Sequence, residues 1–123
     1  MKTILLVDDS KAIRMTMSFV MKNEGFDVIE AEDGLSALKL LDGRKINLII
    51  SDVNMPGLNG LEFVKKLKNE TDYQAYRFVP VVMLTTESSY DKKKEGKDAG
   101  VRAWITKPFP PETLLDTISK LIG

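Results

Sequence analysis

Cysteine and histidine are both absent from this sequence of 123 residues. The lack of cysteine excludes thiol catalysis, cysteine-ligated zinc and a disulfide framework. The lack of histidine removes the commonest general base and metal ligand, together with every Ser-His or Cys-His pair that could activate a nucleophile. Any chemistry must therefore use carboxylates, lysine, hydroxyl groups or the backbone.

The chain also lacks net charge, because 18 lysines and arginines balance 18 aspartates and glutamates. There is no overall electrostatic field to attract nucleic acid or an anionic membrane. The lysines at 92–94 have carboxylates close by in the sequence, which is typical of a solvated helix face. We therefore expect no nucleic-acid partner.

Long apolar runs are missing as well. The longest uninterrupted ones, such as residues 4–7 and 81–84, have four residues, far fewer than a membrane span or the core of a signal peptide requires. A chain of this length is expected to fold as a single domain over residues 1–123, with no need of disulfides or a structural metal. We expect a monomeric, cytoplasmic protein without a membrane partner.

Five short apolar runs alternate with amphipathic stretches, which is the pattern of βα units and a parallel sheet. The predicted strands are residues 4–7, 28–31, 48–51, 81–84 and 101–105. Apolar residues at helical spacing predict helices between these strands and after the last strand. The four sets of apolar residues are Ile13, Met17, Val20 and Met21; Leu35, Leu38 and Leu41; Leu61, Val64 and Leu67; and Leu114, Leu115, Ile118, Leu121 and Ile122. The expected fold is α/β, a doubly wound five-stranded parallel sheet with five helices.

Local signals mark several helix ends. Ser10 and Asn59 are predicted N-caps, and the two prolines at 110–111 suit the entry of the last helix. The fourth helix, over residues 87–98, has poor helix propensity, because Tyr90 is its one large apolar residue and Gly96 interrupts it. Residues 69–77 are polar apart from two tyrosines and are predicted to form a loop.

Polar side chains follow four of the predicted strands. In open parallel sheets, ligands bind beyond the carboxyl ends of the strands. The residues there are Asp8 and Asp9, Asp52, Thr85 and Thr86, and Thr106 and Lys107. We therefore expect these groups to share one site.

Three carboxylates at one edge raise one another's pKa unless positive charge lies among them. Mg²⁺ and the Lys107 ammonium would offset Asp8, Asp9 and Asp52, and a ligand set of oxygen atoms favours a hard ion. Such a site suits phosphoryl transfer, in which an aspartate can itself be the nucleophile. Singly, each motif also has a structural interpretation as a helix cap, a turn or an ordinary loop. Their joint placement at four strand ends favours the functional one.

Four segments carry a resemblance to a known family. They are LVDDS at 6–10, SDVNMPGLNG at 51–60, VVMLT at 81–85 and KPF at 107–109. Together they resemble the receiver domain of two-component response regulators, over residues 2–122. The resemblance implies the strand order 2-1-3-4-5 of CheY-like proteins.

The resemblance also implies roles for individual residues. Asp52 would accept a phosphoryl group from a histidine kinase, and Lys107 and Thr85 would contact its oxygens. The Mg²⁺ ligands would be Asp9, Asp52 and the backbone carbonyl of Asn54, with Asp8 acting through a bound water. The Lys107–Pro108 peptide would be cis.

Three further positions have regulatory counterparts in the family. Trp104 stands where an aromatic residue moves inward as the Thr85 hydroxyl moves towards the phosphate, although it could equally be a partly buried edge residue. Asn54 and Glu87 occupy positions that tune the lifetime of the phosphoryl group, and they match the chemotaxis-type pattern.

The resemblance predicts a stand-alone receiver, because only Gly123 follows the last helix. It would be a phosphoacceptor switch rather than an enzyme, acting through the fourth helix, fifth strand and fifth helix on a protein such as a flagellar motor switch. A phosphorelay intermediate is the alternative. An aspartyl-phosphate phosphatase is less favoured because Asn54 stands where its general acid would be. An FMN module is less favoured because Asp8 and Asp9 would repel the phosphate.

Overall fold

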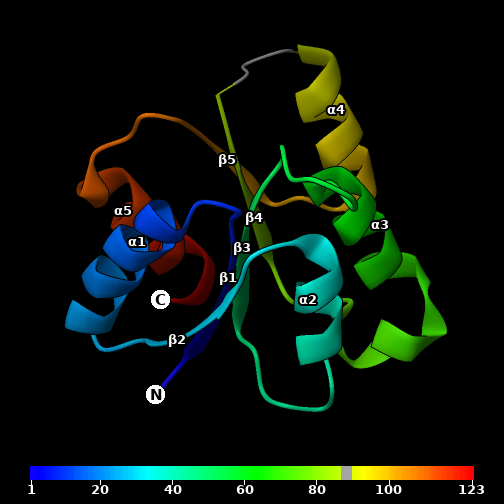
Figure 1. The fold of residues 1–123 in the computed structure, drawn as a ribbon, viewed down its shortest axis with the longest axis horizontal. Helices are drawn as coiled ribbons and strands as arrows, with labels where there is room; N and C mark the ends of the chain where they lie inside the picture. Colours follow the sequence, from blue (N-terminus) through cyan, green and yellow to red (C-terminus); the bar gives the residue numbers. More distant parts are fainter. Residues whose placement is uncertain (87–89) are drawn as a thin grey trace.

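The structure is a computed structural model that describes residues 1–86 and 90–123, without the side chains of residues 90–92. Its sheet has five parallel strands in the order β2-β1-β3-β4-β5, as predicted (Figure 1). The strands are β1 (Thr3–Val7), β2 (Asp27–Ala31), β3 (Leu48–Asp52), β4 (Val81–Thr85) and β5 (Ala103–Thr106).

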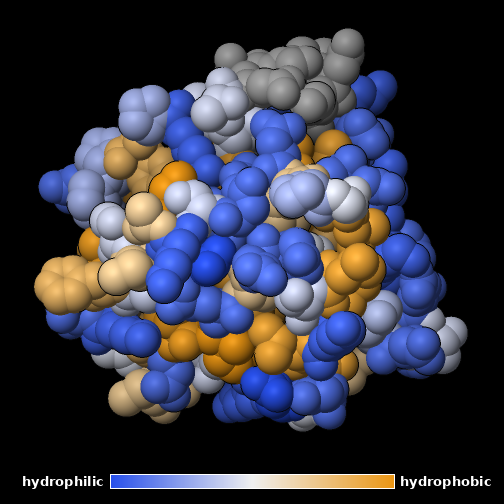
Figure 2. Space-filling view, in the orientation of Figure 1, coloured by the Kyte–Doolittle hydropathy of each residue, from blue (hydrophilic) through white to orange (hydrophobic). Residues whose placement is uncertain are grey.

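In the part of the chain that the structure describes, five α-helices cover the two faces of this sheet, α1 and α5 on one side and α2, α3 and α4 on the other (Figure 1). They are α1 (Lys11–Asn23), α2 (Gly34–Leu40), α3 (Gly60–Asn69), α4 (Tyr90–Ala99) and α5 (Pro111–Ile122). In space-filling view, hydrophilic side chains cover much of the face shown, and hydrophobic ones show mainly between the helical layers in its lower part (Figure 2). No helix of the described residues is long and apolar enough to cross a membrane.

Both faces of the sheet are buried, so each strand contributes alternately to two cores. In β1, Leu5 and Val7 join the core beneath α2, α3 and α4, whereas Ile4 and Leu6 join the core beneath α1 and α5. Burial on both sides explains why the central strands β1, β3 and β4 are largely apolar runs. It also explains why they were predictable from the sequence.

The predicted helix starts are confirmed. The Ser10 side chain accepts a hydrogen bond from the backbone N–H of Ile13. Asn59 and Glu62 form a capping box, in which each side chain accepts a hydrogen bond from the other residue's backbone N–H. Pro111 is the first residue of α5.

Three local predictions are corrected. Residues 69–77 are not simply a loop, because a 3-10 helix, η1 (Thr71–Tyr76), runs through them. The buried Tyr76 hydroxyl anchors it by donating to the Arg44 carbonyl at 2.6 Å and accepting from the Gly43 N–H at 2.8 Å. Leu35 was predicted to be buried on its helix, but it is exposed. The buried face of α2 is formed by Ala37 and Leu38 and continues to Leu41, and Leu35 lies outside this face. Val101 precedes β5, since its N–H donates to the Gly96 carbonyl and completes the turn after α4.

Candidate functional site

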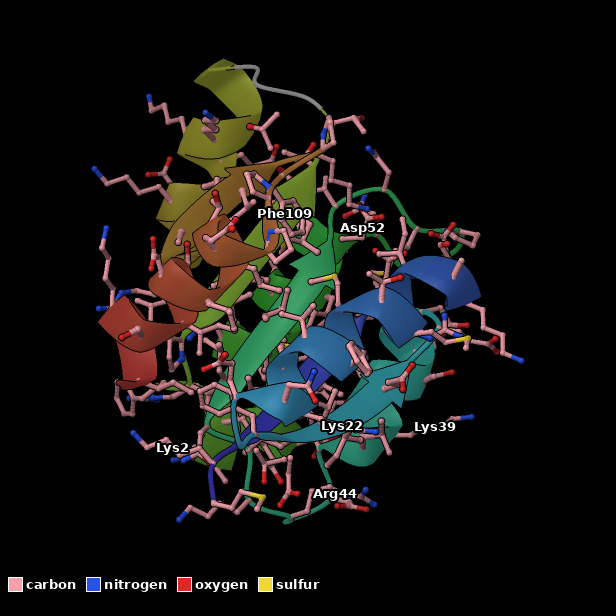
Figure 3. The ribbon with its side chains drawn as sticks, turned by 90° about the vertical axis from the view of Figure 1, so that its left-hand side faces the viewer. Lys2, Lys22, Lys39, Arg44, Asp52 and Phe109 are labelled. Carbon is pink, nitrogen blue, oxygen red and sulfur yellow. The ribbon has the colours of Figure 1, made fainter. Side chains whose placement is uncertain are left out.

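Three aspartates meet at the carboxyl ends of β1 and β3. These strands are parallel neighbours with Val7 opposite Ser51, so Asp8 and Asp52 come next to each other at the edge of the sheet. Asp8, Asp9 and Asp52 each offer a carboxylate oxygen within 4.8 Å of the others. Asp8 and Asp52 are buried, whereas Asp9 is exposed at the mouth of this acidic pocket. In Figure 3, Asp52 lies at the opposite end of the molecule from Arg44.

Lys107 brings positive charge into the acidic pocket. Its Nζ lies 3.0 Å from Oδ2 of Asp52 and 3.2 Å from Oδ2 of Asp8, and only 16% of the side chain is exposed. The lysine follows β5, and its backbone N–H donates to the Thr85 carbonyl at 2.7 Å. The peptide from Lys107 to Pro108 is cis, as the resemblance implied.

Backbone N–H groups orient the two buried carboxylates. Oδ1 of Asp8 accepts from the N–H of Ser10 at 2.9 Å, and Oδ1 of Asp52 accepts from the N–H of Asn54 at 3.2 Å. The segment after Asp52 then passes so close to α3 that a Cβ atom on Gly60 would lie 2.3 Å from the Asp52 carbonyl oxygen. Glycine at this position is therefore a packing requirement.

Among the described side chains, the pocket holds more carboxylates than cationic groups. Burial raises the pKa of Asp52, although the hydrogen bond and the charge of Lys107 oppose this effect. Burial by itself would lower the pKa of Lys107, but its interactions with Asp52 and Asp8 outweigh burial and raise it. One ammonium thus serves two buried carboxylates, with a third at the mouth.

The residues present fit a hard divalent cation. The side chains that converge are carboxylates, two of them buried beside a single lysine, so a cation there would gain oxygen ligands and relieve repulsion. Mg²⁺ fits this donor set, and the exposed Asp9 keeps one side of the cluster open to ligand.

The other predicted site residues that the structure describes lie on β4 and β5 and in the segment after β3. Thr85 is buried at the end of β4, where it pairs in register with Thr106 of β5. Asn54 is exposed, two residues after Asp52. Trp104 is partly buried on β5, and its Nε1 is buried without a hydrogen-bond partner among the described residues. Glu87 lies outside the described residues.

Sequence reasoning missed Arg14. Its side chain is 13% exposed, and it donates from Nη1 to the Asp8 carbonyl at 2.5 Å. The available signal was a charged residue beside Ile13 in the first turn of α1. That signal is weak, because arginine is common on the solvated face of a helix.

The fold and the pocket define a doubly wound α/β protein with an acidic site at the carboxyl edge of its sheet. The family model of the response regulator receiver domain matches residues 4–119. The chain therefore belongs to the receiver domain family of two-component response regulators.

Individual relatives agree with this assignment. The chain is 34% identical to chemotaxis protein CheY1 of Helicobacter pylori over 98% of this chain and 96% of that protein. It is 37% identical to the phosphate regulon transcriptional regulatory protein PhoB of Escherichia coli over 98% of this chain, but it spans only 52% of PhoB. The structure of chemotaxis protein CheY4 of Vibrio cholerae matches with a TM-score of 0.91 and 44% identity, covering 99% of both chains.

Proposed function

We propose that this chain is a phosphorylation-dependent switch of the chemotaxis type, in which Asp52 accepts a phosphoryl group from the phosphohistidine of a histidine kinase. The proposal depends above all on the position of the Asp52 carboxylate, 3.0 Å from Lys107 Nζ and clustered with Asp8 and Asp9. Phosphoryl transfer requires positioning and charge neutralisation more than proton abstraction. The absence of histidine is therefore no obstacle.

In the proposed reaction, a carboxylate oxygen of Asp52 attacks phosphorus as the bond to the donor's imidazole nitrogen breaks. The imidazole keeps that electron pair, and an acyl phosphate forms. Lys107 and the Thr85 hydroxyl would contact the phosphoryl oxygens. Asp9, Asp52 and the backbone carbonyl of Asn54 would hold Mg²⁺, with Asp8 acting through a bound water, and the ion would supply positive charge beside those oxygens.

Phosphorylation would change the charge balance of the pocket. Converting a carboxylate into an acyl phosphate adds roughly one negative charge, which competes for the lysine that now serves Asp52 and Asp8. Movement of Thr85 and Trp104 would carry this change to α4, β5 and α5, biasing an equilibrium between inactive and active conformations.

The surface of α4 and β5 is where we expect the downstream protein to bind. A hollow there is lined by the side chains of Lys93, Lys97, Arg102 and Trp104. A chemotaxis target such as a flagellar motor switch is favoured, because the chain matches chemotaxis proteins along 92% or more of their length.

The proposed activity is limited to the chain's own phosphorylation and dephosphorylation. Asn54 cannot donate and recover a proton as a general acid would, so we expect no turnover of a generic phosphomonoester.

The proposal is tested by adding Mg²⁺ and then acetyl phosphate, while Trp104 emission and intact mass are followed. We expect the emission to change and one phosphoryl group to be added, and both effects should require the metal. Asp52→Asn should abolish both.

Asp42→Asn is the matched control, because Asp42 pairs with the exposed Arg44 at the far end of the sheet. This variant should behave like the unsubstituted protein. An unchanged response in Asp52→Asn would refute phosphorylation at Asp52.

A further inference from the structure

Arg14 on α1 reaches the main chain that carries two of the aspartates. Nη1 donates to the carbonyl oxygen of Asp8 at 2.5 Å, and Nε lies 3.3 Å from Oε1 of Glu30 on β2. The arginine side chain is mostly buried, at 13% exposure, whereas Glu30 is 36% exposed. Arg14 therefore links the edge strand β2 to the loop between β1 and α1.

The peptide that Arg14 holds is the one that joins Asp8 to Asp9. Its carbonyl accepts from the arginine, while Asp8 is further held by its own N–H, which donates to the Ala31 carbonyl, and by the Ser10 N–H on Oδ1. Asp9 is the exposed member of the acidic cluster. Where its carboxylate lies depends on the orientation of this peptide.

Glu30 holds the guanidinium in place. In register it lies opposite Leu6, two residues before Asp8, and its carboxylate offsets the charge of the buried arginine. A guanidinium has a planar set of donors, so it can serve Glu30 and the Asp8 carbonyl at once. A lysine ammonium has no such planar set of donors.

We propose that Arg14, oriented by Glu30, is a positioning residue for the metal site and keeps the Asp9 carboxylate within the acidic cluster. This inference rests on the proposed function, because it concerns the Mg²⁺ affinity of that same site. Groups that orient metal ligands from outside the coordination sphere commonly change metal affinity by about tenfold or more.

Positioning and simple charge predict opposite results. Arg14 places a cation near a cation site, so by Coulomb's law its removal would tighten Mg²⁺ binding. If it acts by positioning, its removal weakens binding instead. The sign of the change therefore distinguishes the two roles.

The experiment measures Mg²⁺ affinity calorimetrically, and unfolding by urea in the presence of a chelator, for Arg14→Gln, Arg14→Lys and Glu30→Gln. We expect Arg14→Gln to weaken Mg²⁺ binding about tenfold. Arg14→Lys should recover less than half of the binding free energy that Arg14→Gln loses. Glu30→Gln should weaken binding by a smaller factor. The control, Arg44→Gln, removes an arginine paired with Asp42 far from the pocket and should leave affinity unchanged.

Unchanged or tighter Mg²⁺ binding in Arg14→Gln, or full restoration by Arg14→Lys, would refute the positioning role and leave the proposed function intact. If Arg14→Gln does not fold, Glu30→Gln decides the matter, and unchanged binding in that variant refutes the role. If the unsubstituted protein binds no Mg²⁺, the proposed function fails and this inference fails with it.

Discussion

Gly96 of α4 and Trp104 of β5 occupy complementary space. A Cβ atom at position 96 would lie 2.3 Å from Cζ2 of the indole ring, a distance at which one of the two groups must move. The ring therefore fills the space that a side chain at position 96 would need. A glycine that weakens the helix locally is explained by the packing of a tryptophan from a neighbouring strand.

Gly96→Ala should therefore destabilise the protein. Alanine improves helix propensity by about 1 kcal/mol, but overpacking costs about 1–3 kcal/mol, so we expect a net loss of about 1 kcal/mol. Displacement of the ring should also shift Trp104 emission to longer wavelength. Urea unfolding and fluorescence measure the two effects.

Lys94→Ala is the control for that experiment, because Lys94 is exposed on the same helix and does not line the hollow beside Trp104. Its emission should match that of the unsubstituted protein. A more stable Gly96→Ala variant with unchanged emission would contradict the proposed packing.

Asp52→Asn should stabilise the fold at neutral pH without Mg²⁺. Burial raises the pKa of Asp52 above its unfolded value of 3.8, so the folded state favours the protonated form. The protein therefore loses stability as the pH rises from 3.8 through the pKa of the folded state. Removing the charge should recover on the order of 1 kcal/mol at pH 7. Well below pH 3.8 the gain should disappear, because the Asp52 carboxyl of the unsubstituted protein is then neutral in both the folded and the unfolded state.

The pKa of Asp42 is shifted in the opposite direction to that of Asp52. The hydrogen bond of Asp42 with Arg44 lowers its pKa to about 2, so its contribution to stability is present above pH 3.8 and is lost as pH falls from there through about 2. Asp42→Asn should therefore reduce stability at neutral pH. Chemical unfolding across the pH range tests both variants, and a destabilised Asp52→Asn at pH 7 would show that its contact with Lys107 outweighs burial.

Asn54→Ala and Glu87→Ala should each lengthen the life of the phosphoryl group. Both positions follow a proposed site residue by two, and their polar side chains would orient the attacking water. Loss of this orientation should slow dephosphorylation about tenfold. Decay is followed by intact mass after the phosphodonor is removed. Equal decay rates in both variants and the unsubstituted protein would exclude this role.

The strands and the acidic cluster were predictable because local sequence encodes them. Runs such as Leu48, Ile49 and Ile50 are apolar throughout since both faces of the sheet are covered. Asp8 follows such a run directly, Asp52 follows one after Ser51, and parallel strands end at the same edge. Leu35 was mispredicted because spacing within one helix does not show where its buried stripe is centred.

The sequence by itself determined the strand positions, the doubly wound class and the set of residues at the carboxyl edge, because each of these follows from near neighbours in the chain. Only the tertiary structure decided that Lys107 bridges Asp8 and Asp52, that Arg14 holds the Asp8 carbonyl, and that Trp104 requires Gly96. These contacts join different elements, and they depend on the distances and side-chain directions that arise when helices pack on a twisted sheet.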